Sequence, residues 1–391
     1  MPLDLTPALC LPEDGCAGTL IGRVWVPGEG PAVVALRDDQ VFDLGRAAPT
    51  VAALLNGDDP VRTVRNAAFE RPIGTAATIL ANSDASRREP GRPWFLAPID
   101  LQAVKAAGVT FIASLLERVV EEQSRGDPAR AVEIRRSLGE EIGGDLGAVR
   151  PGSAEAARLK EALQKRAMWS QYLEVGIGPD AEIFTKCQPL ASVGVGADIG
   201  LHPASVWNNP EPEIVLAVNA SGHIVGASLG NDVNLRDFEG RSALLLSKAK
   251  DNNGSSAIGP FLRLFDDTFS LDDVRRTEVA LEVRGPEGYV LTGRSSLAMI
   301  SRDPADLVGQ AIGPAHQYPD GFVLYLGTMF APIEDRDEPG QGFTHKVGDI
   351  VTIASPKLGV LRNRVGTSDR IARWEFGAVA LMHNLAGRGL L

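Results

Sequence analysis

The segment PEPEIVLAVNASGHIVGASLGNDV (residues 210–233) contains two apolar runs separated by the turn sequence Asn-Ala-Ser-Gly. Apolar and β-branched runs on both sides of such a turn predict a β-hairpin. Glu211 and Glu213 are two residues apart, so on a strand their side chains point to the same face. A hairpin would return Asp232, nineteen residues after Glu213, to a place beside them. Three carboxylates that leave other coordination positions of a divalent cation free are typical of a metal site that also binds a substrate.

An alternative interpretation of the two glutamates is a solvated edge strand, because two anions on one face repel each other unless a positive charge lies between them. Both glutamates border the apolar run EIVLAV (213–218), and the hairpin brings a third carboxylate toward them. These two features favour the cation site.

The composition limits the class of protein. The chain has 391 residues, 44% of them hydrophobic and 23% charged, which allows a large core and two domains. A formal net charge of −11 argues against a nucleic-acid or anionic-membrane partner. No apolar run reaches the eighteen residues of a membrane span. Three cysteines are compatible with a reducing compartment, so we expect a cytoplasmic protein. None of them lies in a CxxC pair, so the sequence indicates neither a zinc site nor a redox motif.

Changes in pattern along the chain predict an α+β protein with two domains. Residues 1–93 contain short strand-like runs and end in the polar stretch NSDASRREPGRP (82–93), which indicates a small β-rich domain and a linker. We assign residues 94–391 to a catalytic domain. Within it, residues 114–170 carry apolar residues at helical spacing and predict a helical, lid-like insertion, at positions such as Leu116, Val119, Val120, Leu138, Ile142, Leu159, Leu163 and Ala167.

Further candidate site residues surround the carboxylates in the sequence. Lys250 lies in SKAKD (247–251), and a nearby cation would lower the pKa of its ammonium group and make it available as a base. The alternative is a surface lysine, and Lys248, two residues away, is equally placed on this evidence. Ser256 follows in a predicted tight turn, where its hydroxyl and backbone N–H groups are candidates for ligand contact.

Two more residues have a functional and a structural interpretation. Lys186 can pair with an anionic substrate group or hold the end of a strand. His202, in Gly-Leu-His-Pro, can contact a substrate or cap a turn. The other histidines form no metal-binding set, and the sequence has no Gly-x-Ser-x-Gly elbow for a serine hydrolase.

The order of these motifs resembles the fumarylacetoacetate hydrolase superfamily over about residues 94–365. The motifs that carry the resemblance are Glu-x-Glu, Asn-Asp-Val followed by Arg236-Asp237, a lysine nine residues before Gly259-Pro260, Leu326-Gly327-Thr328, VGDIV (347–351), and upstream FTK (184–186) and SVG (192–194). The resemblance implies a mixed, rolled β-sheet and a commonly dimeric assembly. It also implies Mg²⁺ or Mn²⁺ bound by Glu211, Glu213 and Asp232, with Lys250 as the matching lysine and Thr328 receiving the carboxylate of a 2-oxo acid.

Three strings are similar to the branch of 2-keto-3-deoxy-sugar-acid dehydratases, namely GVTF (108–111), SLLER (114–118) and WNNPEPE (207–213). This branch implies Mg²⁺-dependent dehydration of 2-keto-3-deoxy-D-xylonate, equivalently D-arabinonate, to 2-oxoglutarate semialdehyde in oxidative pentose catabolism. It adds Ser114 to the expected substrate contacts and implies a homodimer or a dimer of dimers.

We hypothesise that Lys250 removes a C3 proton, which the metal acidifies, and that Glu117 serves the leaving C4 hydroxyl. The alternative for Glu117 is a solvated residue near a helix start, where its charge favours the helix dipole. Two rival functions remain open. One is hydrolysis of a C–C bond in an acylpyruvate-type substrate, although residues 101–201 contain no histidine to pair with Glu117. The other is metal-dependent binding of a 2-oxo acid without turnover.

Overall fold

The computed structural model describes residues 2–67, 71–125, 127, 129–134, 149–165, 169–330, 332, 334–338 and 342–391. Three positions expected to be helical, Leu138, Ile142 and Ala167, lie outside these residues.

Eleven strands form the larger sheet in the order β4-β3-β2-β1-β11-β10-β9-β14-β6-β7, and β5 pairs with β1. The β14–β6 pair is parallel and the others are antiparallel, so the sheet is mixed. The strands are β1 (Leu20–Val26), β2 (Gly30–Arg37), β3 (Gln40–Asp43), β4 (Pro72–Thr75), β5 (Trp94–Leu96), β6 (Ala103–Gly108), β7 (Glu182–Cys187), β9 (Pro212–Val218), β10 (Ile224–Asp232), β11 (Ser256–Leu264) and β14 (Phe322–Tyr325).

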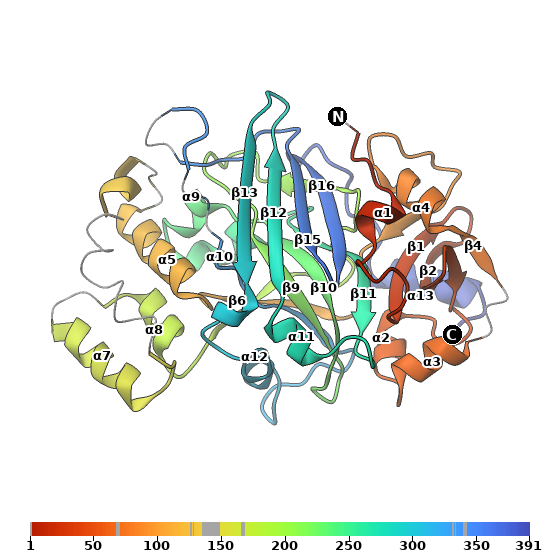
Figure 1. Ribbon diagram of the computed structural model, residues 1–391, viewed down its shortest axis with the longest axis horizontal. Coiled ribbons are helices and arrows are strands. Elements are labelled where there is room, and N and C mark those ends of the chain that lie inside the picture. The colour runs from red at the N-terminus through yellow and green to blue at the C-terminus, as the bar shows by residue number, and fades with distance from the viewer. Residues whose placement is uncertain are drawn as a thin grey trace.

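A second sheet of five strands packs on one face of the first, in the order β13-β12-β15-β16-β8. In Figure 1 its strands cross in front of β9 and β10. One apolar core joins the two sheets, with Leu216 of β9 and Leu281 of β12 among its buried members. The strands are β8 (Asp198–Leu201), β12 (Glu278–Arg284), β13 (Val290–Ser296), β15 (Ile350–Ser355) and β16 (Gly359–Thr367).

Helices cover part of the opposite face of the larger sheet. Leu54 of α2 and Val64 of α3 pack there in a second apolar cluster with Val215 of β9. The described helices outside the predicted insertion are α1 (Pro7–Cys10), α2 (Val51–Leu55), α3 (Pro60–Asn66), α4 (Ala76–Ser83), α9 (Arg236–Glu239), α10 (Leu246–Lys250), α11 (Leu271–Arg275), α12 (Pro304–Ala311) and α13 (Ala378–Gly387). None of the described helices is long and apolar enough to cross a membrane. The predicted α+β class with a mixed sheet is confirmed.

The strands of residues 1–93 extend the larger sheet. Leu20 and Ile21 of β1 pair with Arg263 and Leu262 of β11, so backbone hydrogen bonds cross the predicted boundary at residue 93. The division into two domains stays a prediction. The C-terminal helix α13 packs beside these strands, where Asn384 donates a hydrogen bond to the Glu29 carbonyl at 2.6 Å.

The predicted insertion contains α5 (Ile112–Ser124), α7 (Ala154–Lys165) and α8 (Gln171–Ile177). A third apolar cluster holds these helices together, and it includes Leu115, Leu163, Leu173 and Trp207. The helical spacing that the sequence predicted at Val119 and Leu163 is confirmed in α5 and α7. The proposed action of this segment as a lid stays a prediction.

Asp349, in the predicted Gly-Asp motif, fastens the segment before β15. Its carboxylate accepts hydrogen bonds from both terminal nitrogens of Arg336, at 2.6 and 2.7 Å, and contacts His345 Nδ1 at 3.0 Å. Burial alone raises the pKa of Asp349, but the hydrogen bonds from Arg336 and His345 outweigh it and lower the pKa to about 2. The backbone N–H of His345 in turn donates a hydrogen bond to Asn208 Oδ1 at 3.1 Å, which ties this segment to the WNNPEPE stretch (207–213).

We predict that Asp349→Asn destabilises the protein by about 2–4 kcal/mol at pH 7, because Arg336 loses a buried carboxylate partner. A carboxyl group with a lowered pKa stabilises the fold above its ordinary pKa near 4, and this contribution is lost as the pH falls toward 2. Urea unfolding of both proteins from pH 7 to pH 3 tests this. The difference should be constant down to about pH 4 and then narrow; a difference that widens below pH 4 contradicts the assignment.

Candidate active site

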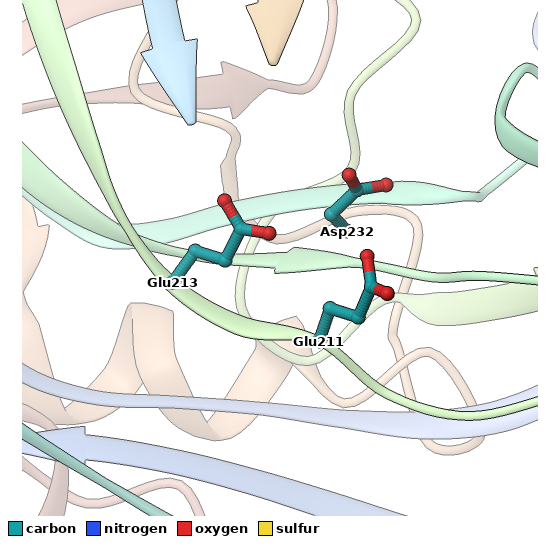
Figure 2. A group of neighbouring side chains, drawn as sticks. All are labelled: Glu211, Glu213 and Asp232. Carbon is teal, nitrogen blue, oxygen red and sulfur yellow. The ribbon is translucent and has the colours of Figure 1, made fainter. Parts of the chain in front are cut away.

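The register of β9 and β10 places the three predicted carboxylates together. Glu213 pairs with Gly230, and Asp232 donates its backbone N–H to the Glu211 carbonyl at 3.0 Å. One oxygen of each carboxylate lies within 4.8 Å of the others, and all three residues are buried. Figure 2 shows the three side chains converging from the two neighbouring strands. The predicted hairpin, and with it the approach of Asp232 to the glutamates, is confirmed.

Backbone groups fix the two glutamates. The Gly327 N–H donates to Glu213 Oε2 at 2.7 Å, and Asn231 Oδ1 accepts from the Glu211 N–H at 3.1 Å. Gly327 has a φ of +84°, and a Cβ there would overlap the Thr110 hydroxyl. The glycine of the Leu-Gly-Thr motif is therefore needed for the backbone to reach Glu213.

Three cations balance part of this negative charge. Lys250 Nζ contacts Glu211 Oε2 and lies 3.1 Å from Asp232 Oδ2. Lys186 Nζ lies 2.8 Å from Asp232 Oδ1, and Arg118 Nη2 lies 2.6 Å from Glu211 Oε1. Glu213 has no ion pair with any described residue. Burial, together with the charges of Asp232 and Glu211, raises the pKa of Glu213 well above its ordinary range.

The donor set fits a divalent cation. Carboxylate oxygens are the ligands that Mg²⁺ and Mn²⁺ prefer, and a dication would supply the positive charge that Glu213 lacks. Burial lowers the pKa of Lys250, but the carboxylates of Asp232 and Glu211 raise it more, so the pKa lies above its ordinary value. The sequence predicts a lowered pKa for Lys250 beside a bound cation. The neighbours that the structure describes are carboxylates, and they raise the pKa instead.

A small cavity of about 20 Å³ opens beside the carboxylates. Its wall includes all three of them together with Ser114, Arg118, Glu182, Glu239, Lys250 and Thr328. The space suits a single ion or water, whereas pockets for small organic ligands span roughly 300–1,000 Å³. At this size the cavity does not hold a sugar-sized acid, and α5 supplies part of its wall through Ser114 and Arg118.

Two of the five expected substrate contacts, Ser114 and Thr328, line this cavity. Ser114 Oγ donates to the Phe111 carbonyl at 2.8 Å, and Thr328 Oγ1 accepts the Phe330 N–H at 3.1 Å. Both hydroxyl groups keep further hydrogen-bonding capacity for a ligand.

Lys186, Ser256 and His202 are not part of the cavity wall. Lys186 is fully buried behind Asp232, where its ammonium also donates to the Val233 carbonyl at 3.2 Å and to the Lys250 carbonyl. Ser256 Oγ is 2.8 Å from Ser192 Oγ and 2.9 Å from the Tyr325 hydroxyl. His202 accepts the Ala204 N–H at Nδ1, as expected of a turn residue. These contacts favour the structural interpretation of all three.

Glu117 lies on α5 but is not part of the cavity wall. Its Oε2 is 3.1 Å from Arg236 Nη2, and Arg236 Nε is 2.6 Å from Glu121 Oε1. The Arg236 guanidinium also stacks over Trp207 at 4.4 Å from the ring centre. This network fastens α5 to α9, so a role of Glu117 in proton transfer stays a prediction.

Sequence reasoning missed three charged residues of the wall, Arg118, Glu182 and Glu239. Arg118 follows Ser114 by one helical turn, a spacing that puts both on one face. Glu182 precedes Phe184 by two residues, the spacing of one strand face. Burial raises the pKa of Glu182, and burial raises the pKa of Glu239 to about 7 despite the opposing effect of Arg118.

Glu182 has a sequence signal of its own in the GVTF string. Gly108 pairs with Glu182 across β6 and β7, and a Cβ at position 108 would overlap the Glu182 carboxylate. Glycine there leaves room for a charged side chain at the cavity. No ion pair or hydrogen bond engages the Glu182 carboxylate among the described residues.

The family described as fumarylacetoacetate (FAA) hydrolase C-terminal matches residues 154–366, which is more than half of the chain. The chain belongs to the fumarylacetoacetate hydrolase family. All three carboxylates, Lys250 and Thr328 fall inside the matched range.

Two relatives in this family carry dehydratase names. A probable 2-keto-3-deoxyxylonate dehydratase of Haloferax volcanii is 28% identical over 214 residues, 55% of this chain and 68% of that protein. A 2-dehydro-3-deoxy-D-arabinonate dehydratase of Saccharolobus solfataricus is 28% identical over 183 residues, 46% of this chain and 57% of that protein. The alignment thus spans little more than half of the second relative.

Solved structures of the family share the fold. A hexagonal crystal form of 2-keto-3-deoxyarabinonate dehydratase aligns with a TM-score of 0.60 at 21% identity, over 89% of this chain and 98% of that one. A 2-keto-3-deoxy-D-arabinonate dehydratase complexed with magnesium and 2,5-dioxopentanoate aligns with a TM-score of 0.60 at 21% identity, over 89% and 99% of the two chains. At this identity the likeness concerns the fold.

We predict that Glu213→Gln abolishes stabilisation by Mg²⁺. A ligand at 100 times its dissociation constant stabilises a protein by about 2.7 kcal/mol, so the wild type should unfold a few degrees higher with Mg²⁺ than with a chelator. Without metal, Glu213→Gln should be at least as stable as the wild type, because it removes a buried carboxyl group whose ionised form no described cation pairs with. Thermal unfolding measures both effects, and exposed Glu278→Gln is the control. An undiminished Mg²⁺ response in Glu213→Gln would exclude this site.

Proposed function

We propose that this protein is a Mg²⁺-dependent dehydratase of a 2-keto-3-deoxy sugar acid, acting on 2-keto-3-deoxy-D-xylonate, equivalently D-arabinonate, to give 2-oxoglutarate semialdehyde. The observation that carries the proposal is the cavity where three buried carboxylates, Lys250 and the Glu182 carboxylate meet. The names of the two relatives support the substrate class.

The proposed cofactor is Mg²⁺ or Mn²⁺, held by Glu211, Glu213 and Asp232. Bound there, such an ion would supply Lewis-acid chemistry, which would make the C3 protons of a 2-oxo acid more acidic. A magnesium complex of one dehydratase with this fold supports the choice of ion.

Two residues of the cavity wall are assigned to proton transfer. Lys250 accepts one C3 proton through Nζ once its neighbouring carboxylates are neutralised, because their charge is what holds the ammonium protonated. A protonated carboxyl group then donates to the C4 hydroxyl, the C4–O bond breaks, and water leaves. The elimination product, 5-hydroxy-2-oxopent-3-enoate, carries a C3=C4 double bond. Loss of one C5 proton and protonation at C3 move this double bond to C4=C5, and the enol formed in this way tautomerises to the semialdehyde.

We assign the carboxyl group to Glu182 in preference to Glu117. Glu182 faces the cavity, and burial raises its pKa, which favours the protonated form that an acid needs. Glu117 is engaged by Arg236, so its proposed part is to hold α5 in place. Ser114 and Thr328 are assigned to substrate contact, and Lys186, Ser256 and His202 to support of the wall.

The proposed assembly is a homodimer or a dimer of dimers in the cytoplasm, within oxidative pentose catabolism. The resemblance of the motifs to their family supports the assembly, and the named sugar acids support the pathway. We also propose that residues 1–93 form a small β-rich domain with a linker and that residues 94–391 form the catalytic domain.

Incubation with 2-keto-3-deoxy-D-arabinonate and Mg²⁺ should release 2-oxoglutarate semialdehyde, and a chelator should stop the reaction. Product analysis by mass spectrometry separates the alternatives. Pyruvate plus a second carbonyl or carboxyl fragment indicates C–C bond cleavage. Saturable binding without product indicates a binding protein, and either result contradicts dehydration.

A matched pair of substitutions tests the acid. Glu182→Gln should lower kcat by about 10²–10⁴-fold, because the amide cannot donate a carboxyl proton. Glu117→Gln should stay within a few-fold of the wild type, since its neighbour Arg236 keeps Glu121 as a partner. Steady-state kinetics at saturating Mg²⁺ measure both. The opposite ranking would assign the acid to Glu117 and refute the role of Glu182.

A further inference from the structure

The cavity has a second charged pair apart from the metal carboxylates. Glu239, on α9, is buried and lies in the cavity wall, with its Oε2 2.9 Å from Arg118 Nη1. The other terminal nitrogen of the same guanidinium, Nη2, contacts Glu211 Oε1 at 2.6 Å. One guanidinium therefore separates Glu239 from a predicted metal ligand.

Glu239 Oε2 has an unused capacity to accept hydrogen bonds. It lies close to Arg118, but no described residue makes a hydrogen bond of suitable geometry to it. A carboxylate offers about four acceptor sites, so the ion pair with Arg118 leaves Glu239 able to accept from a further donor. A hydroxyl group entering the cavity would meet this need.

The comparison with Glu121 shows that Glu239 is not simply part of the structural network. Glu121 binds the same Arg118 at 2.7 Å and also Arg236 at 2.6 Å, so both of its oxygens have cationic partners. Glu121 is not part of the cavity wall, whereas Glu239 is. The Glu121 carboxylate therefore holds α5 in place, whereas the Glu239 carboxylate faces the cavity.

We infer that Glu239, positioned by Arg118, is the residue that recognises the terminal hydroxyl group of a hydroxylated 2-oxo acid. The inference rests on the proposed function and names its substrate class, a 2-oxo acid with a polyhydroxylated chain. The 2-oxo acid end lies at the metal carboxylates, and the hydroxyl end donates to Glu239. A site built to bind a hydroxyl group discriminates against analogues that lack it, because the analogue supplies no donor to the buried carboxylate.

Two unreactive probes of equal chain length test this inference. Neither 5-hydroxy-2-oxopentanoate nor 2-oxopentanoate carries a C4 hydroxyl group, so neither can be dehydrated. Isothermal titration in saturating Mg²⁺ should show the wild type binding the hydroxylated probe about tenfold more tightly or better, as expected of a hydrogen bond to a charged group. The control Glu278→Gln should keep this ratio.

Glu239→Leu should reduce the ratio to about 1 while its affinity for 2-oxopentanoate stays within about threefold of the wild type. Glu239→Gln keeps an acceptor oxygen and the size of the side chain, so its ratio should fall at least about threefold but remain above that of Glu239→Leu. Circular dichroism confirms folding, and if the leucine variant does not fold, the glutamine variant decides. A wild-type ratio near 1, or an unchanged ratio in Glu239→Gln and any folded Glu239→Leu, overturns the inference.

The two proposals fail differently. If the wild type binds neither probe in Mg²⁺, the proposed 2-oxo acid site is wrong, and the hydroxyl recognition falls with it. If 2-oxopentanoate binds in a Mg²⁺-dependent manner but Glu239 has no effect on the ratio, the proposed function stands and the role of Glu239 is wrong.

Discussion

Three carboxylates brought together inside a protein repel one another, and the rest of this site depends on how that repulsion is offset. The β9–β10 register, together with hydrogen bonds from Gly327 to Glu213 and from Glu211 to Asn231, places Glu211, Glu213 and Asp232 together in a buried cluster. The compensating cations come from β7, α10 and α5, as Lys186, Lys250 and Arg118. Breaking a buried ion pair by removing one partner costs about 3–5 kcal/mol, so this charge balance constrains how three distant segments pack.

Local pattern explains why part of the site could be predicted from the sequence. The two-residue spacing of Glu211 and Glu213 and the turn before β10 are short-range patterns, and they predict the hairpin without knowledge of the rest of the fold. The choice between Lys248 and Lys250 is different. Local pattern does not separate them, and the sequence favoured Lys250 only through its nine-residue distance to Gly259 in the resembled motif. In the structure Lys250 is buried against the carboxylates, whereas Lys248 is exposed beside the Phe238 ring, because of the phase of α10 against the sheet.

Arg118 could not be assigned in the same way, because its partner Glu211 is 93 residues away and the contact depends on how α5 docks. Glu182 and Glu239 likewise reach the cavity through long-range packing. Conversely, the sequence motifs around Lys186, Ser256 and His202 suggested substrate contact. In the structure their polar atoms make hydrogen bonds to other protein groups outside the cavity wall. Motif spacing identifies residue types near a site; the tertiary structure decides which of them face the ligand.

The position of Arg118 links the two ends of the proposed substrate. Its guanidinium contacts Glu211 at one nitrogen and Glu239 and Glu121 at the other. By simple electrostatics, a cation bound at Glu211 would weaken the attraction between that carboxylate and Arg118, and so would favour the pairing of Arg118 with Glu239. Arg118 sits on α5, which Arg236 also fastens through Glu117 and Glu121. A single side chain, Arg118, thus contacts a predicted metal ligand, the carboxylate assigned to the hydroxyl group and the network that fastens α5.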